Sequence, residues 1–311
     1  MNALNLNSIW SDCKESYDLC NKLISTVYRK MIEEKVVPKG FGGWGPFVVM
    51  FPDESVTFEK YQRIFPYDAE QAFHESFSVA VREGYLTFDE NGYHAADKGE
   101  EITQTVMQAF TDALAPLQPM PQAEIKRLVD YLIRLCEATD AAPEPPSHFC
   151  QTVYKNYKRT FPNDAPLTRL FVHYYKELDF YRTDAHAAAW QIHNVAGNRW
   201  EAFTVIWNGD ADTLDKFYEE YSDRGFTREE YAHAFQELVE RGWLEENASA
   251  YRVTAEGKRI REEAEALTDK YFFAPWACLN ESELEELARL ASQLRDGLLN
   301  LDNMDNQGSI E

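Results

Sequence analysis

Apolar residues recur every three or four positions along most of the chain, which predicts a mainly helical protein. Residues 11–34 show the pattern well, because Tyr17, Cys20 and Ile24 fall on one face of a helix. The run KGFGG at residues 39–43 is predicted to be a turn that ends this helix. Further helices are predicted over residues 44–50, 57–64, 68–83, 122–137, 167–193 and 200–207.

Two segments interrupt the helical pattern and predict short β-hairpins. Residues 81–99 read VREGYLTFDENGYHAADKG, and residues 239–257 read VERGWLEENASAYRVTAEG. The segments align without a gap, so that Gly99 matches Gly257. Asn91-Gly92 is a strong signal for a tight hairpin turn. A match of this length at a fixed offset indicates an internal repeat.

The repeat extends on both sides of the hairpins. Upstream, WGPF from Trp44 matches WEAF from Trp200, and downstream EIKRLVDYLIRL from Glu124 matches ELEELARLASQL from Glu283. The chain is therefore predicted to hold two copies of one helical unit that carries a small hairpin. The predicted boundaries are repeat 1 at residues 1–138, a proline-rich linker at 139–148, repeat 2 at 149–299, and a polar, disordered tail at 300–311.

Helix-capping patterns mark several predicted helix starts. Thr227 with Glu230 forms the sequence pattern of a capping box. Asp68 with Gln71 shows a similar pattern before the helix predicted to end at residue 83. Asp97 with Glu100 is predicted to cap the helix after the first hairpin.

The residues of the second copy resemble a winged helix-turn-helix domain of the MarR-like class. The stretches that carry the resemblance are FQELVERGWL at 235–244, YRVTAEGKRIREEAEALTD at 251–269 and LNESELEELARL at 279–290. The first copy is similar over residues 44–135. The chain is also similar to an uncharacterised bacterial family of tandem proteins related to MarR, and the similarity includes residues 182–190. The resemblance implies two winged-helix repeats in one chain that form a pseudo-dimer, with a ligand cleft between the dimerisation helices and the winged lobe.

Composition and charge bear on the partners of such a fold. The 311 residues are 44% hydrophobic and 14% aromatic, which is ample for packed cores, and the formal net charge is −22. The acidity either keeps the protein soluble or forms a surface for a basic partner. The five cysteines form no CxxC pair, and no apolar run approaches the length of a membrane span. We therefore expect a cytoplasmic protein, monomeric by internal pseudo-dimerisation or a weak homodimer, with no membrane partner.

The same acidity disfavours duplex DNA as a partner. MarR-like proteins place the third helix of the unit in the major groove, and affinity comes largely from Lys and Arg on phosphates. In the second copy this helix offers Arg228 and Arg241 among four glutamates. The hairpin tips, Asp89-Glu90-Asn91 and Asn247-Ala248-Ser249, carry no arginine. We expect DNA binding to be weak or lost.

The densest cluster of polar side chains lies in the helix predicted over residues 167–193. In a continuous helix Arg182, His186, Trp190 and His193 share one face. By resemblance to MarR-like dimers, this helix lines the ligand cleft. A second stripe holds His173, Glu177, Tyr181 and Asp184.

These residues support two interpretations. In a small-molecule site, Arg182 binds an anion, His186 acts as acid, base or donor, Asp184 orients a neighbour and Trp190 forms an apolar wall. In the architectural alternative, Arg182 and Asp184 pair across to the other copy, and His186 is a satisfied interior histidine.

The class of protein stays open between three hypotheses. The first is a MarR-like, regulator-related protein that binds a small ligand in this cleft. The second is an enzyme that uses the same cleft, with His186 and Asp184 in acid–base roles beside Arg182, and the third is an acidic protein-interaction module. A metal held by His173, His186 and His193 is a further alternative, although the HExxH motif is absent. The sequence identifies neither the ligand nor a cofactor.

Overall fold

The computed structural model describes residues 5–308, which are mainly helical. The first half runs α1 (Leu6–Glu33), α2 (Phe41–Met50), α3 (Phe58–Ile64), α4 (Glu70–Arg82), β1 (Leu86–Asp89), β2 (Gly92–Ala95), α5 (Asp97–Leu114) and α6 (Gln122–Asp140). The second half runs α7 (Phe149–Tyr154), a 3-10 segment (Lys155–Thr160), α8 (Leu167–Gln191), α9 (Gly197–Asn208), α10 (Leu214–Tyr221), a 3-10 turn (Ser222–Arg224), α11 (Arg228–Glu240), β3 (Leu244–Asn247), β4 (Ala250–Val253), α12 (Ala255–Phe273), a 3-10 segment (Ala274–Cys278) and α13 (Glu281–Gly308).

Both predicted hairpins are present, each as an antiparallel strand pair. Leu86 pairs with Ala95 in the first hairpin, and Leu244 pairs with Val253 in the second. After each hairpin a glycine packs directly on backbone. A Cβ on Gly99 would lie 2.1 Å from the carbonyl oxygen of Tyr85, and one on Gly257 would lie 2.2 Å from that of Trp243. These two aligned glycines are therefore required by the same close contact.

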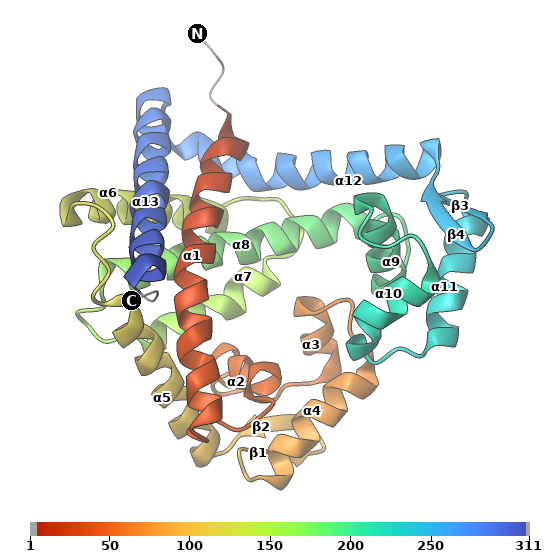
Figure 1. The fold of residues 1–311 in the computed structure, drawn as a ribbon, viewed down its shortest axis with the longest axis horizontal. Helices are drawn as coiled ribbons and strands as arrows, with labels where there is room; N and C mark the ends of the chain where they lie inside the picture. Colours follow the sequence, from red (N-terminus) through yellow and green to blue (C-terminus); the bar gives the residue numbers. More distant parts are fainter. Residues whose placement is uncertain (1–4, 309–311) are drawn as a thin grey trace.

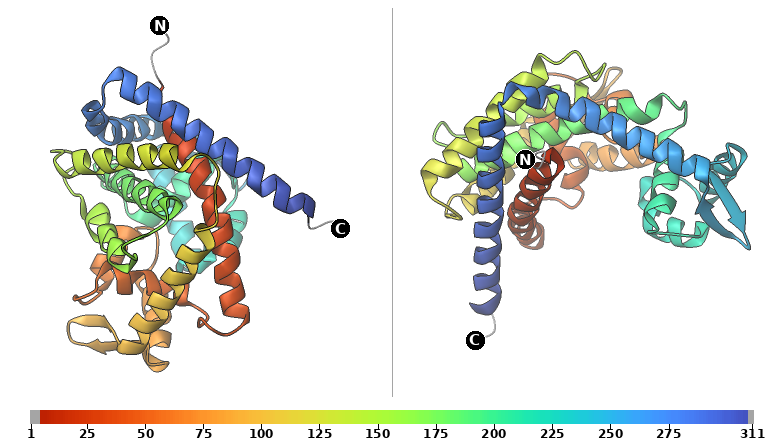
Figure 2. Two further views of the ribbon diagram at one scale, coloured as in Figure 1. Left: turned by 90° about the vertical axis from the view of Figure 1, so that its left-hand side faces the viewer. Right: turned by 90° about the horizontal axis from the view of Figure 1, so that it is seen from above.

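The helices form a central layer and two lobes (Figure 1). In the central layer α1 packs along α13, α6 packs along α8, and α8 packs along α12. The first lobe is built from α2, α3, α4 and the first hairpin, and the second from α9, α10, α11 and the second hairpin. Figure 2 shows α12 and α13 diverging from one corner, with α13 beside α1 and α12 reaching the second lobe. No helix within residues 5–308 has the length and apolarity needed to cross a membrane.

Several predicted boundaries move in the structure. Helix α2 begins at Phe41, inside the run predicted to be a turn, because Gly43 and Gly45 serve close packing. A Cβ at Gly43 would lie 2.5 Å from the Ser76 hydroxyl, and one at Gly45 would lie 2.4 Å from the Phe41 ring. Helix α13 continues to Gly308 through part of the predicted disordered tail, while residues 309–311 lie outside the described residues.

Of the three predicted helix caps, one is confirmed and two are wrong. Thr227 and Glu230 form the expected capping box at α11. At α4 the N-cap is Ala69 without a side-chain bond, because Asp68 is used in a contact between the lobes. At α5 the N-cap is Ala96, and Asp97 is already the first helical residue.

Candidate ligand-binding site

Helix α8 is continuous, as predicted, and its two polar stripes face different surroundings. Arg182, His186 and Trp190 line a cavity of about 450 Å³ between α8 and the segment after α3. Arg224 reaches the same cavity from the second lobe. Asp184, Tyr181, Glu177 and His173 are buried. The structure therefore brings three of the predicted residues together in a cavity, places these four in the interior, and leaves His193 half-buried beyond the end of α8.

The charged residues of the predicted cluster already have protein partners. The Arg182 guanidinium donates to Asp269 on α12 at 2.8 Å. The carboxylate of Asp184 accepts the backbone N–H groups of Cys150 and Gln151, each at 3.0 Å, at the start of α7. Burial raises the pKa of Asp184, although these two hydrogen bonds oppose the shift. Both partners belong to the second half, so the predicted pairing across to the first copy is wrong.

His186 is held by hydrogen bonds on both ring nitrogens. The Trp200 indole N–H donates to Nε2 at 3.3 Å, so Nε2 carries a lone pair. Nδ1 lies 3.3 Å from the Thr268 hydroxyl, which itself donates to the Ala264 carbonyl oxygen. The bond network therefore assigns the proton to Nδ1. Burial, helped by the Arg261 guanidinium, lowers the pKa of His186 to about 4, so the ring is neutral at physiological pH.

The rings at the end of α8 form an aromatic stack with α9. Trp190 stacks on Trp200 with ring centroids 5.8 Å apart, and His193 stacks on the same indole at 6.1 Å. His193 also meets Trp243 edge-on. Burial lowers the pKa of His193. This packing fills the space between α8, α9 and the second hairpin.

The second stripe lies against α7 and the linker. The Tyr181 hydroxyl donates to the carbonyl oxygens of Glu144 and Tyr271, at 2.7 and 3.2 Å. His173 is fully buried, and burial with the Arg169 charge lowers its pKa to about 3. The contact of 3.6 Å between His173 and Glu177 therefore joins a neutral imidazole to a carboxyl whose pKa is itself raised by burial. No group of three potential metal ligands occurs among the described residues.

A second cavity, about 430 Å³ in volume, lies at the other end of α8. Helices α1, α2, α5 and α8 surround it, together with the 3-10 segment Lys155–Thr160. Its walls are mainly aromatic, which suits the flat body of an organic molecule. The aromatic lining residues are Tyr17, Tyr28, Phe41, Phe65, Phe110, Tyr154, Tyr157 and Phe180.

Arg169 is the unusual charge of this second cavity. The side chain is 4% exposed, and its Nε is buried without a hydrogen-bond partner within the described residues. The ionisable groups that act on it are the phenols of Tyr154, Tyr157 and Tyr17, and none is a carboxylate. Burial lowers the pKa of the guanidinium. Arg169 also lies in the first turn of α8, where the helix dipole disfavours a cation.

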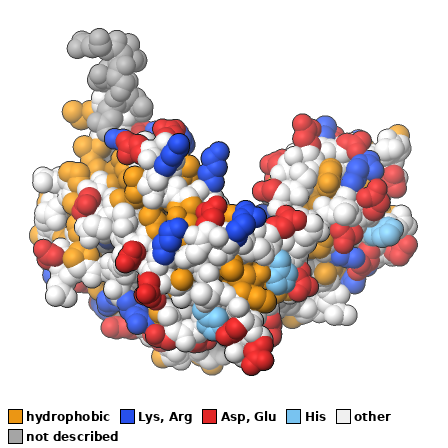
Figure 3. Space-filling view, turned by 90° about the horizontal axis from the view of Figure 1, so that it is seen from below, with side chains coloured by type: hydrophobic (Ala, Val, Ile, Leu, Met, Phe, Trp, Pro, Cys, Tyr) orange, Lys and Arg blue, Asp and Glu red, His pale blue; other side chains and the backbone are white. Residues whose placement is uncertain are grey.

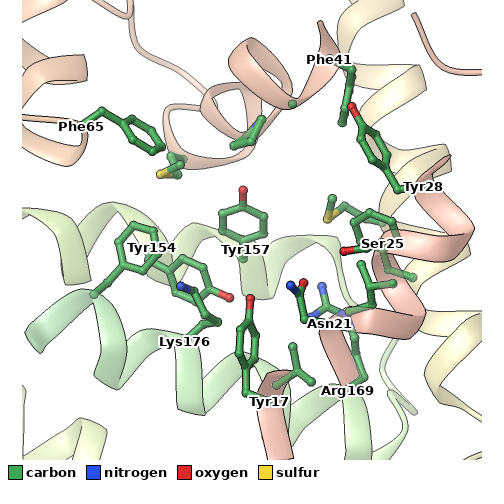
Figure 4. Close-up of a pocket in the computed structure, with 18 residues that line it drawn as sticks. Tyr17, Asn21, Ser25, Tyr28, Phe41, Phe65, Tyr154, Tyr157, Arg169 and Lys176 are labelled. Carbon is green, nitrogen blue, oxygen red and sulfur yellow. The ribbon is translucent and has the colours of Figure 1, made fainter. Parts of the chain in front are cut away.

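Polar groups from α1 and α8 lie near this charge. Figure 4 shows Asn21 of α1 beside Arg169, with the hydroxyl of Tyr17 directed into the cavity. Lys176 also lines the cavity, but its ammonium group is paired with Asp179 at 2.6 Å. Within the part of the chain that the structure describes, the arrangement therefore offers a buried cation that has no ion-pair partner, with hydrogen-bonding groups next to it and aromatic rings around it.

The family model described as the Helix-turn-helix family matches residues 94–304, about two thirds of the chain. The chain belongs to the Helix-turn-helix family. The match begins in the first hairpin and includes α8 and the whole second lobe. No curated protein and no solved structure matches the chain significantly. The chemistry of a site in this family member therefore follows from its own residues.

The basic residues of the second lobe's predicted reading helix are engaged within the protein. Arg228 of α11 donates to Asp215 at 2.6 Å. Arg241, at the end of α11, pairs with Glu237 and donates to the carbonyl oxygens of His193 and Asn194. Figure 3 shows Asp and Glu side chains spread over the face seen from below. Neither arginine is therefore free to contact a phosphate without giving up an existing partner.

Sequence reasoning missed Arg169, although a signal was present. In a helix, opposite charges three or four residues apart can form an ion pair. The residues at these distances from Arg169 are Ala165, Pro166, Val172 and His173. Arg169 lies in the first helical turn, has no acidic residue at these positions and is followed by an aromatic run. This pattern indicates a charge whose partner, if any, comes from another part of the protein or from a ligand.

Proposed function

We propose that this Helix-turn-helix family protein is a ligand-binding, regulator-related protein that takes a small organic anion into the cavity around Arg169. One observation carries the proposal, namely a buried guanidinium without a carboxylate partner at the wall of a cavity of about 430 Å³. An unpaired buried charge is costly, whereas a bound carboxylate or sulfonate would supply the missing charge and accept bidentate hydrogen bonds.

The proposed ligand has an anionic head and an aromatic or flat apolar body. Arg169 would hold the head, with Asn21 and the Tyr17 hydroxyl as further hydrogen-bonding groups. Phe41 and Phe110 would contact the body. The cavity volume falls within the ordinary range of about 300–1,000 Å³ for small-molecule pockets. The ligand would thus lie on the helix predicted to line the cleft, about three turns before the predicted cluster.

We further propose that the chain is a pseudo-dimer of two MarR-like winged units. The order of helices and hairpin in the first half recurs in the second, and Gly99 and Gly257 make equivalent contacts. The central packing is reciprocal in this scheme, because α1 lies on α13 while α6 lies on α8. In the second unit, Trp190 stacks on Trp200, and Trp200 donates to His186, while Arg182 beside them is paired with Asp269, so this unit offers no comparable unpaired guanidinium within the described residues, which favours one ligand per chain.

Duplex DNA is a disfavoured partner in this proposal. The net charge is −22, and the arginines of α11 are paired with carboxylates. Electrostatic attraction to phosphates supplies most non-specific affinity for DNA, and a net charge of −22 opposes that attraction. We therefore propose that the winged fold serves ligand binding more than DNA reading.

The experiment compares a charged probe with a neutral probe of nearly the same shape. Fluorescence titration with 1-anilinonaphthalene-8-sulfonate should show one site per chain, and Arg169→Met should weaken this binding by at least about tenfold. The neutral N-phenyl-1-naphthylamine should bind wild type and variant equally. Arg182→Met, which removes a paired arginine from the same helix, is the control. Equal sulfonate affinity in wild type and Arg169→Met would overturn the proposal.

A further inference from the structure

The two lobes touch at the N-terminal ends of α4 and α11. The Ala69 backbone N–H, just before α4, donates to the carbonyl oxygen of Arg224 at 2.8 Å. A Cβ on Gly225 would lie 2.8 Å from the Cβ of Ala72 on α4. Close by, a Cβ on Gly197 would lie 1.8 Å from the carbonyl oxygen of Pro66. The second lobe therefore meets residues 65–72 through positions that have no room for larger side chains.

Arg224 is the central charge of this contact. Its guanidinium donates to Asp68 of the first lobe at 3.0 Å and to Glu201 of the second lobe at 3.0 and 3.1 Å. Asp68 also accepts from the Tyr61 hydroxyl at 2.5 Å, which anchors it to its own lobe. A single arginine thus joins a carboxylate from each lobe, and this use of Asp68 explains why it does not cap α4.

The contact is narrow compared with the packing that holds the rest of the molecule together. The central layer joins the halves through long helices and a large apolar core, whereas the lobes meet through residues 66–72 of the first lobe and through Gly197 and residues 222–225 of the second, with Tyr67 packed against the core of the second lobe. Small contacts between domains open more readily than large hydrophobic ones. The contact between the lobes is therefore the part of the fold best suited to have two states.

The position of the contact bears directly on how the fold could read a duplex. Two helix-turn-helix units that bind adjacent major grooves place their reading helices about 34 Å apart, with the N-terminal residues of those helices on the bases. Here Glu70 of α4 lies within the first touching segment, and Arg228 of α11 lies three residues after the second. In this arrangement the two ends cannot enter successive grooves together.

We propose that Arg224, with Asp68 and Glu201, forms a latch that holds the two lobes closed, with the N-terminal ends of α4 and α11 at the contact. Release of the latch lets the lobes separate while the central helical layer stays intact. The latch acts whether or not an anion occupies the cavity around Arg169, so this inference stands apart from the proposed function.

The test measures the distance between the lobes. Spin labels are attached at Glu83→Cys and Glu240→Cys, near the far ends of α4 and α11, with the exposed Cys278 replaced by serine. Double electron–electron resonance should give one narrow distance distribution for the otherwise wild-type chain. Arg224→Ala should shift the distribution to longer distances, by more than its original width. Arg228→Ala removes an arginine paired within the second lobe and should leave the distribution unchanged.

A second variant covers the case in which Arg224→Ala does not fold. Asp68→Asn keeps the shape of the first-lobe partner and removes its charge, and it should lengthen or broaden the distribution in the same direction. Circular dichroism checks that the helical content is retained. A wild-type distribution that is already broad overturns the latch, as does an unchanged narrow distribution in whichever of the two variants folds.

Discussion

Replacing Arg169 by methionine should stabilise the ligand-free protein, which is the reverse of the usual effect of a buried substitution. Arg169 is 4% exposed, and its guanidinium has no carboxylate partner within residues 5–308. Methionine has a similar reach, fills the same space and carries no charge. The substitution therefore removes a desolvation cost and leaves no partner unpaired.

The size of the effect follows from two opposing contributions. Replacing buried ion pairs by apolar side chains of similar volume stabilises proteins by about 1–4 kcal/mol in favourable cases, and a buried charge without a carboxylate partner lacks the attraction that offsets part of its desolvation cost. Arg169 loses one attractive contact, because its guanidinium lies 4.2 Å from the centroid of the Phe161 ring, and such a contact contributes about 0.5–2 kcal/mol. We expect a net gain of about 1–2 kcal/mol, which corresponds to a rise in Tm of a few degrees for a chain of this size.

Urea unfolding followed by circular dichroism measures this gain. The midpoint should rise while the slope of the transition stays constant, because the same surface is exposed on unfolding. Arg182→Met is the matched control on the same helix, and it should lower stability by about 1–2 kcal/mol, since Asp269 loses its partner. If Arg169→Met lowers the midpoint as much as Arg182→Met does, the guanidinium is structurally satisfied and the reasoning fails.

Three further outcomes are expected. His186→Ala should lower the free energy of unfolding by about 1–3 kcal/mol, because Trp200 and Thr268 lose a partner, and an unchanged melting curve would contradict the interior role. Burial raises the pKa of Glu201 from 4.5 to about 7, so the wild type loses stability as pH rises through this range. The free energy of unfolding of Glu201→Gln, relative to wild type, should therefore increase as the pH rises from 4.5 to about 7, by up to about 3 kcal/mol. A difference in stability that does not change with pH would refute this prediction. Gel shifts with random duplex DNA at near-physiological salt should show no binding, and a shift with a steep salt dependence would reveal a basic face.

Local patterns in the sequence determined much of the architecture. Helical periodicity predicted α8 to within a few residues, and the Thr227–Glu230 pair predicted the capping box of α11. The aligned segments 81–99 and 239–257 predicted both hairpins. These features depend on residues that are neighbours along the chain, so the chemistry that produces them is visible in the order of the amino acids.

Only the tertiary structure decided which polar groups have partners. Arg182 and His186 looked available in the sequence, but Asp269, Thr268 and Trp200 engage them. Asp68 looked like a helix cap, but it pairs with Arg224, 156 positions away. The sequence around Arg169 lacks an acidic neighbour at helical spacing, but only folding reveals that the side chain is buried among phenols, with no carboxylate partner within the described residues. Whether a charge is satisfied depends on residues brought together from distant parts of the chain, and no local pattern records that pairing.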